Sequence, residues 1–496
     1  MKPSSERLFM MAAGLCVMAV AAAIAFQMIT ERKRSAAVAR MKSSVAATQQ
    51  RAAAGPPVTS AEGGKPDRSG PTRSAPAKAS ESVAAFAALF PKVRALEDDK
   101  RWETFYEEVL LKKDARDWTI DEQAAAKNFT DEARPLIQEI RRLANLGGPA
   151  IELDYSKGGA IELPHLAPLR TCARLLGIDA DVQAQQGNYE EAAEDILASF
   201  KLGNAIKDEP ILISQLFRCA MDGITYAGVQ EALPQDGLDP ELARRVIETA
   251  GRAEAHQNFA ESFTLEAMIG LEHFERFRDG NTESLLYHDR TQSMLDIWGV
   301  LPENRAGQRI FVTAYSSVIV RPWLNMDETT YSETIPRIQE AAQLPYDQAL
   351  PVMQQIEQDI ADLPHTRVLT RTLLPDLTRR IAAQARDEAF LALTRVGLAL
   401  ELYHAQNGAY PTSLDAIAPI LGGHVPVDPF TGQPLGYKPS GQSFVLYSVG
   451  QDLVDDGGKP GYNDGGGLDY RTGDIVWRAQ PKADTGSAGQ SKRLSV

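Results

Sequence analysis

Aspartate and glycine are concentrated in one segment near the C-terminal end of the chain. From residue 428 to residue 474 there are seven aspartates and eleven glycines, but no glutamate. Calcium takes about six to eight oxygen ligands from carboxylates and backbone carbonyls. Glycine lets the backbone turn those carbonyls inward, at conformations that other residues avoid. This composition predicts a structural calcium site, and a solvated acidic turn is the alternative.

Composition alone supplies four candidate ligands. They lie in the glycine-rich part of the segment, and they are Asp455, Asp456, Asp464 and Asp469. Their spacing is not that of an EF-hand loop. A bound calcium ion would neutralise these crowded carboxylates and order a loop that is otherwise rich in glycine.

Catalysis is a second use for the same carboxylates. A metal-dependent hydrolase would need a titratable group held beside them in a cleft, and the candidates are His404 and His424. Nothing in the spacing places either histidine next to the aspartates. The chain also has no Gly-x-Ser-x-Gly, phosphate-loop, dinucleotide or His-Glu-x-x-His motif. We therefore expect a protein that is not an enzyme, and a hydrolase is the alternative.

Length and charge narrow the class of protein further. A chain of 496 residues is too long for a single core, so several structural units are expected. The net charge of −14 argues against a nucleic-acid partner, because phosphate recognition needs a basic surface. The charge is also uneven. Residues 1–80 hold 12 basic and 4 acidic side chains, against 40 and 62 in the rest of the chain.

The cysteines and tryptophans carry no obvious chemistry. Three cysteines exclude a disulfide framework and a four-thiolate zinc site. Cys172 and Cys219 lie in apolar helical contexts, so two separate buried thiols are expected. Trp298 and Trp323 are expected in the core rather than stacked on a cofactor.

The N-terminal region contains a candidate membrane span. Residues 8–29 contain no charged side chain. As a helix at about 1.5 Å per residue they extend roughly 33 Å, enough for a hydrocarbon core of about 30 Å. The sequence therefore predicts a single-pass anchor in residues 1–34, with the lipid bilayer as a partner. A cleaved signal peptide is the alternative.

The direction of this span is not settled by its flanks. Arg32, Lys33 and Arg34 follow it, and by the positive-inside rule they favour a cytoplasmic C-terminal side. A calcium site favours the opposite, because free calcium is abundant outside the cytoplasm. We expect a single-pass inner-membrane protein with an extracytoplasmic C-terminal domain, and the conflict with the basic flank stands.

Composition divides the rest of the chain into four parts. Residues 35–81 contain no aromatic and almost no large aliphatic side chains, and they are expected to form a disordered linker. Apolar residues then recur every three or four positions, which predicts an irregular all-α body over residues 82–378. A small hairpin at residues 151–163 is a possible exception. An α+β domain follows at residues 379–478, and residues 479–496 form a disordered tail.

One part of the body resembles half of a tetratricopeptide repeat. Small residues between Ala184 and Ala193 let two helices approach closely, and Tyr189 is expected to pack between them. No second copy occurs at a spacing of 34 residues, the period of that repeat. A helical-repeat module that binds peptides is the alternative function, while a single hairpin in an irregular bundle is the expected structure.

The pattern of secondary structure changes at about residue 379. A long helix is predicted over residues 381–403, followed by a short helix through Ile417 and Leu421. Alternating runs predict strands at residues 435–437 and 444–449, and a further strand is expected at residues 474–477. The segments that carry a resemblance to a known family are Ala399–Tyr403, Asn407-Gly408, Tyr410-Pro411, Val427–Phe430, Gly432, Tyr437, Phe444–Asp452 and Asp474–Trp477.

In this order they resemble the globular part of the major pseudopilin of type II secretion systems. The resemblance covers about 100 of the 496 residues. It implies a long helix packed on a small antiparallel sheet, with a loop before the last strand that binds calcium. It also implies that Asp452 is a ligand, because it matches the family's aspartate after Ser-x-Gly, and that Val449 donates its carbonyl.

Two departures from the family change what the resemblance implies. No processing site precedes the apolar run, and the pseudopilin-like domain lies some 350 residues beyond it. Assembly into a pseudopilus is therefore not expected. We expect a membrane-anchored, non-enzymatic envelope protein, mostly α, with a calcium-stabilised pseudopilin-like domain. Its role would be interaction or scaffolding with other envelope or secretion-system proteins.

Overall fold

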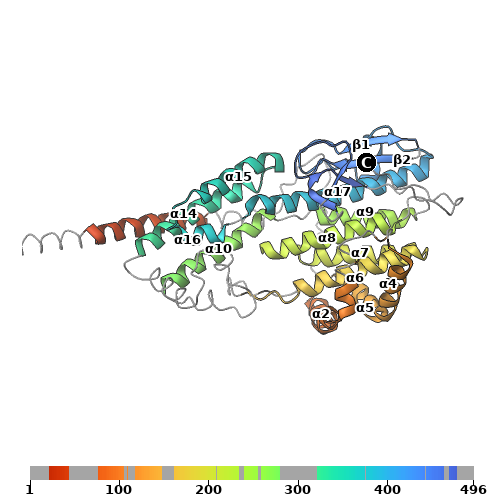
Figure 1. Ribbon diagram of the computed structural model, residues 1–496, viewed down its shortest axis with the longest axis horizontal. Coiled ribbons are helices and arrows are strands. Elements are labelled where there is room, and N and C mark those ends of the chain that lie inside the picture. The colour runs from red at the N-terminus through yellow and green to blue at the C-terminus, as the bar shows by residue number, and fades with distance from the viewer. Residues whose placement is uncertain are drawn as a thin grey trace, which may run out of the picture.

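The protein is mostly helical, with two small antiparallel sheets near its C-terminal end (Figure 1). This confirms the expected helical class and the C-terminal antiparallel sheet. A computed structural model describes residues 22–43, 76–105, 109, 115, 118–147, 153, 161–207, 209–233, 239–254, 259–279, 321–374, 376–441, 443–462 and 468–477. The expected hairpin at residues 151–163 lies almost entirely outside these residues, as do Trp298 and the tail at 479–496.

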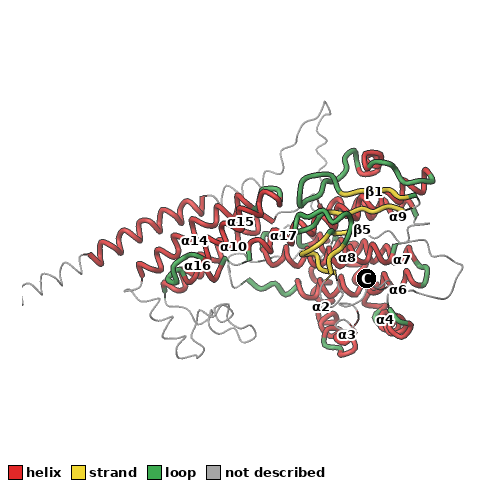
Figure 2. The backbone as a smooth tube through the Cα atoms, turned by 45° about the horizontal axis from the view of Figure 1, so that its top comes forward, coloured by secondary structure: helices red, strands yellow, loops and turns green. Residues whose placement is uncertain are grey.

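The helices fall into two groups along the chain. The first group is α2 (Pro76–Glu97), α3 (Lys100–Phe105), α4 (Ile120–Glu132), α5 (Arg134–Asn145), α6 (Leu166–Gln185), α7 (Tyr189–Ala205), α8 (Leu212–Ala232) and α9 (Pro240–Glu254). The second is α10 (Phe259–Arg278), α14 (Arg321–Ala341), α15 (Tyr346–Ala361), α16 (Val368–Leu373) and α17 (Leu377–Asn407), with a 3₁₀ helix, η4 (Leu414–Leu421). Figure 2 shows that helices make up most of the described backbone.

The first group is a stack of helical pairs. In this stack α4 contacts α6 and α6 contacts α8, while α5 contacts α7 and α7 contacts α9. Helices α4, α6 and α8 begin 46 residues apart. The sequence carries a matching signal, because six residues of α6 recur 47 positions later in α8. They are Leu169, Cys172, Ala173, Ala180, Val182 and Gln183, which recur as Leu216, Cys219, Ala220, Ala227, Val229 and Gln230.

The hairpin of α6 and α7 corrects one expectation about packing. Gly187 makes the turn with φ of +79°, and Ala192 and Ala193 are buried, as small residues at a close helix contact should be. Tyr189, however, is 40% exposed and does not pack between the helices. It is the first residue of α7, so its side chain lies at the edge of the hairpin. Cys172 and Cys219 are free and buried, which confirms the expected separate thiols.

Helix α17 joins the stack to the C-terminal sheet. Two residues with left-handed backbone angles bound this helix. Asp376 precedes its first residue, and Gly408, with φ of +77°, follows its last. Helix α17 contacts α8, α9 and α15 of the body, and it also contacts β2, β5 and η4. The expected boundary at residue 379 therefore falls inside an element that the body and the sheet share. One continuous cluster of buried apolar residues, from residue 41 to residue 477, includes parts of both. A second apolar cluster is formed mainly by α2 to α6.

The larger sheet has the strand order β1–β2–β5, with β1 (Gly436–Ser440), β2 (Ser443–Ser448) and β5 (Ile475–Trp477) all antiparallel. A separate pair is formed by β3 (Pro460–Tyr462) and β4 (Leu468–Gly473). The sheet approaches α17 closely at Gly397, where a Cβ would lie 2.3 Å from Trp477. Only glycine leaves room for that ring, so the contact fixes β5 against the helix.

Residues 22–43 form a helix that packs on α14 at the end of the molecule away from the sheets (Figure 1). Residues 35–43, expected in the disordered linker, continue this helix, and Ala37 and Met41 are buried because they lie one turn apart on its packed face. Residues 76–81, also expected in the linker, belong to α2. Within the described parts of the chain, no helix combines the length and apolarity needed to cross a membrane. Of the expected span, residues 8–21 lie outside them.

A buried charged cluster lies where α8 meets α17. The Nη1 atom of Arg218 is 3.2 Å from the Oδ2 atom of Asp222 and 3.2 Å from the Oδ2 atom of Asp387. All three side chains are almost completely buried. Burial raises the pKa of Asp222 well above its usual range, and the neighbouring Asp387 raises it further. Burial also raises the pKa of Asp387. The fold therefore binds a proton at this pair more tightly than the unfolded chain does.

Removing the shared cation should destabilise the fold strongly. In Arg218→Met the two buried carboxylates lose their counter-charge, and we expect the free energy of unfolding to fall by about 3–5 kcal/mol. Asp222→Asn should behave differently. A raised folded pKa contributes stability below the ordinary carboxyl pKa of about 4, and this contribution is lost as pH rises through the raised value. Asp222→Asn should therefore make stability depend less on pH.

The measurement is the urea midpoint of the detergent-solubilised full-length chain, for wild type and both variants, between about pH 5 and pH 8. Equal pH dependence in wild type and Asp222→Asn would contradict a bound proton at this pair. A midpoint of Arg218→Met close to that of wild type would contradict the cluster's role in joining α8 to α17.

Candidate functional site

The carboxylate of Asp474 organises the loop that precedes β3. Its Oδ2 atom accepts hydrogen bonds from the backbone N–H groups of Gly458, at 2.5 Å, and Lys459, at 3.3 Å, and Oδ1 accepts one from Asp456 at 3.3 Å. The N–H of Asp474 donates in turn to the carbonyl of Lys459 at 2.9 Å. Asp474 is 2% exposed, so these bonds hold the loop against the sheet from the inside.

Asp428 performs the same task at the other end of the segment. Its Oδ1 atom accepts from the N–H of Phe430 and from the hydroxyl of Ser448, and its Oδ2 atom accepts from the N–H of Val449, all at 2.9 Å. Burial raises the pKa of both Asp428 and Asp474, although the backbone and hydroxyl donors oppose this.

A repeated local pattern explains much of the aspartate content. Four aspartates each accept a hydrogen bond from the backbone N–H two residues further on, which is the Asx-turn geometry. These are Asp428 to Phe430, Asp452 to Val454, Asp455 to Gly457 and Asp469 to Arg471. Aspartate favours such turns whether or not an ion is bound.

The candidate ligands fall into two places in the structure. Val449, Asp452, Asp455 and Asp456 lie in the loop between β2 and β3. The Oδ2 atom of Asp452 accepts from the N–H of Gly473 at 2.9 Å, so this carboxylate ties the loop to the end of β4. Asp455 accepts from the hydroxyl of Tyr447 at 2.9 Å, which lowers the pKa of Asp455.

Asp469 lies on another element. Asp469 is on β4, where it pairs with the Arg471 guanidinium at 2.9 Å, and this contact lowers the pKa of Asp469 to about 2. Asp464 lies outside the described residues. Within the described ranges, no three His, Cys, Asp or Glu side chains are grouped as a metal site would require. The calcium site stays a prediction.

Two glycines are required by the way the loop folds back on the sheet. Gly458 has φ of +89°, and a Cβ there would lie 2.4 Å from the Cγ1 atom of Val445. Gly473 has φ of +71°, and a Cβ there would lie 2.5 Å from the backbone nitrogen of Gly461. Glycine is the residue that adopts such conformations without strain, so part of the glycine content serves close packing rather than ion binding.

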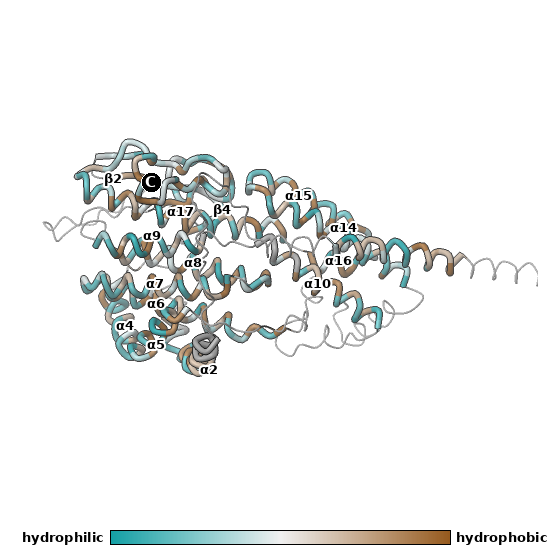
Figure 3. The backbone as a smooth tube through the Cα atoms, turned by 180° about the vertical axis from the view of Figure 1, so that it is seen from behind, coloured by the Kyte–Doolittle hydropathy of each residue, from teal (hydrophilic) through white to brown (hydrophobic). Residues whose placement is uncertain are grey.

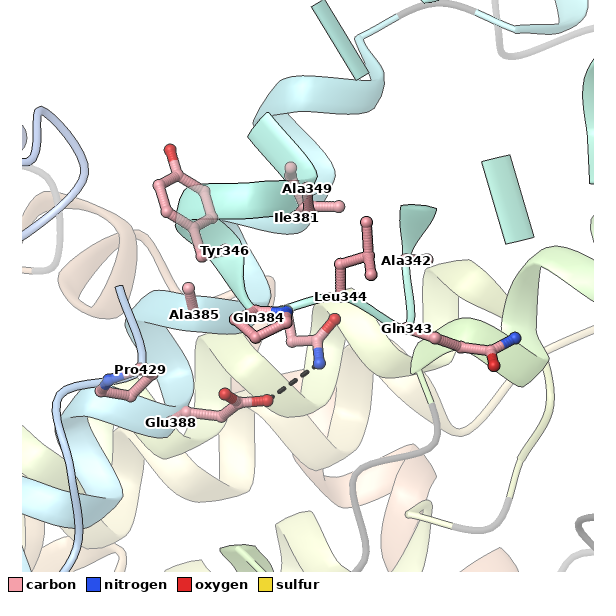
Figure 4. Close-up of a pocket in the computed structure, with 11 residues that line it drawn as sticks. Ala342, Gln343, Leu344, Tyr346, Ala349, Ile381, Gln384, Ala385, Glu388 and Pro429 are labelled. Carbon is pink, nitrogen blue, oxygen red and sulfur yellow. Dashed lines mark hydrogen bonds between the residues drawn. The ribbon is translucent and has the colours of Figure 1, made fainter. Parts of the chain in front are cut away.

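A pocket of about 270 Å³ lies beside this loop, between the α14–α15 turn and α17 (Figure 4). Leu344 and Ile381 line the pocket. Pro429, from the segment between η4 and β1, closes it. Glu388 places a carboxylate in the wall of the pocket, and this carboxylate accepts a hydrogen bond from the Nε2 atom of Gln384 at 2.8 Å. Tyr346 connects the pocket to the loop, because its hydroxyl donates to the carbonyl of Gln451 at 3.3 Å.

The two histidines considered for catalysis lie on other elements than the aspartate-rich loop between β2 and β3. His404 lies near the C-terminal end of α17 and stacks on Tyr410, with ring centroids 4.3 Å apart. His424 follows η4 in the turn after Gly423. Comparison with protein-family models, with curated proteins and with solved structures finds no match for this chain.

The Asp474 bonds predict a large difference between two aspartates of the same segment. Asp474→Ala removes the acceptor of three backbone N–H groups inside the loop, and we expect the free energy of unfolding to fall by about 2–3 kcal/mol. Asp469→Ala is the matched control, because it removes the acceptor of a single backbone N–H, that of Arg471, and a contact with an exposed guanidinium, so a clearly smaller loss is expected. Urea midpoints of the two full-length variants test this, and similar losses would contradict it.

Proposed function

We propose that this protein is a membrane-anchored, non-enzymatic envelope protein that holds a pseudopilin-like unit away from the bilayer. The observation that supports the anchor most directly is the helix of residues 22–43. Its first two turns leave Ile24, Met28 and Ile29 more than half exposed to solvent. These three residues are the end of the uncharged run that begins at Leu8, and Figure 3 shows this apolar end projecting beyond the body.

The second half of the same helix is fixed to the body. Arg34 pairs with Glu328 of α14 at 3.0 Å, and Met41 lies completely buried in the main apolar cluster. An outer contact joins Arg40 to Glu333 at 3.2 Å. An anchor connected in this way transmits its position to the body, because a packed helix is far stiffer than a disordered linker.

The C-terminal unit consists of α17, η4 and the strands β1 to β5. Its sheet lies at the opposite end of the molecule from the helix of residues 22–43 (Figure 1). Its long helix against a small antiparallel sheet agrees with the arrangement that the pseudopilin resemblance implies. Here α17 is covered by α8, α9 and α15, which leaves the helix embedded in its own chain rather than available to neighbouring copies. This supports a unit used for interaction instead of for assembly into a filament.

The stacked helical pairs suit the same role. Stacks of paired helices present extended surfaces to protein partners, and in this stack α4 and α5 contact α6 and α7, which in turn contact α8 and α9. The proposed partners are other envelope or secretion-system proteins, which would contact the stack and the C-terminal unit.

The anchor predicts how a single charge in the apolar run will act. Met18→Arg places a charge near the middle of residues 8–29, at a cost of about 2.5–3.5 kcal/mol for insertion. We expect a larger share of the full-length protein to be released from membranes by alkaline carbonate. Ala36→Arg adds the same charge to an exposed position beyond the run and should leave the protein in the membrane.

A reporter fused after residue 478 identifies the side of the membrane on which the C-terminal unit lies, and an extracytoplasmic signal is expected. Release of the wild-type protein by carbonate would contradict the anchor. A cytoplasmic reporter signal would contradict the envelope location.

We further propose that calcium binds in the loop between β2 and β3, through Asp452 and Asp456. Calcium at about 100 times its dissociation constant should stabilise the folded state by about 2.7 kcal/mol. The apparent melting temperature of the full-length chain should therefore rise on adding calcium and fall with a chelator.

The double variant Asp452→Asn, Asp456→Asn should lose this response. Asp121→Asn, an exposed change on α4, should keep it. A melting temperature of the wild-type chain that is the same with calcium and with chelator would contradict the site.

A further inference from the structure

The helix of residues 22–43 runs parallel to α14, and their contacts fix the register between them. Going along both helices in the same direction, Phe26 meets Trp323, Thr30 meets Asn325, and Arg34 meets Glu328. The Phe26 and Trp323 ring centroids are 6.0 Å apart, with the rings nearly perpendicular. The first turn of α14 is therefore level with the part of the other helix that belongs to the apolar run.

This register places α14 relative to a bilayer. Phe26 lies three residues before the end of the run at Ile29, which is about 4.5 Å along a helix. The run is about as long as the hydrocarbon core is thick, so Ile29 falls near the edge of that core. Trp323, beside Phe26, then lies at the border between acyl chains and headgroups, where tryptophan is enriched in membrane proteins.

The exposure of Trp323 fits such a position. It was expected in the core, but it is 39% exposed, while its neighbours Pro322 and Leu324 are buried. The indole contacts Phe26 in a T-shaped arrangement, and part of the indole side chain stays exposed. A large aromatic side chain left open next to an apolar helix end gains free energy if lipid covers it.

The charges at this level also suit a headgroup layer. The acidic groups Glu31 and Glu328 are both paired with Arg34, at 2.6 Å and 3.0 Å. Arg32 and Lys33 remain exposed on the same helix, one turn beyond the apolar run. Asp279, at the end of α10, is exposed as well and opposes them in part.

We propose that the first turn of α14 is a second membrane contact, in which Trp323 enters the interfacial layer of the bilayer beside Phe26. The body then rests directly on the membrane, with α14 and the anchoring helix as two adjacent supports. This inference rests on the proposed anchor, since the bilayer is positioned by residues 8–29. Its partner is the lipid surface and not another protein.

The experiment uses the full-length chain reconstituted in phosphatidylcholine and phosphatidylglycerol vesicles whose acyl chains carry bromine close to the headgroup. Bromine quenches indole fluorescence on contact, and the chain has five tryptophans. We expect Trp323→Phe to show a smaller quenched fraction than wild type. Trp102→Phe is the matched control, because Trp102 is 4% exposed in the other apolar cluster, and its loss should not reduce the quenched emission.

Carbonate extraction of the same vesicles separates the two proposals. Retention of the protein with equal quenched emission in wild type and Trp323→Phe would overturn the α14 contact while leaving the anchor in place. Release of the protein would overturn both. A contact with a second copy of the chain would also overturn the lipid contact, and it would appear as cross-linking in detergent that Trp323→Phe abolishes.

Discussion

The fold depends on the burial of α17 between two partners. Neither the helical stack nor the small sheet covers this helix alone, because it presents apolar residues in nearly every direction. Arg218 supplies the polar connection on one side, and Gly397 admits Trp477 on the other. The ring of Tyr226 stacks on that of Phe390, with centroids 4.5 Å apart, and its centroid lies 6.3 Å from that of Trp477. One aromatic group therefore joins α8, α17 and β5. The C-terminal sheet is therefore fixed to the helical body and is unlike a domain on a flexible connection.

The aspartate-rich loop shows how a single composition can serve two physical purposes. Carboxylates that accept backbone N–H groups order a glycine-rich loop without an ion, as Asp428 and Asp474 do. An ion orders such a loop by neutralising charge, and Asp452 and Asp456 are placed on its outer side, where they are exposed. The two arrangements are compatible, because a carboxylate oxygen that accepts one hydrogen bond keeps a second lone pair. Calcium would then add stability to a loop that the buried aspartates already shape.

Local pattern predicted the elements well and their long-range contacts poorly. The expected helix at 381–403 lies within α17, and the expected strands at 435–437, 444–449 and 474–477 correspond to β1, β2 and β5. Apolar periodicity is a property of one segment, so it could not reveal that α17 belongs equally to the body. The recurrence of α6 in α8 escaped a search at 34 residues because its spacing is 47 and most of its positions differ. The exposure of Tyr189 and Trp323 depends on what lies beside them, which composition does not encode.

A packed anchor has a mechanical consequence that a flexible linker would not have. Thr30, Arg34 and Met41 hold the helix of residues 22–43 against the body. If residues 8–29 anchor the chain as proposed, the body cannot swing freely about the membrane. Because α17 contacts α15 near this end and the sheet at the other, the position of the C-terminal unit is set through a continuous series of packed helices. Under the proposed anchor, the distance of that unit from the bilayer would be a property of the fold. A proposed partner would then have to meet the unit at that distance, and a rigid scaffold would gain selectivity that affinity alone does not supply.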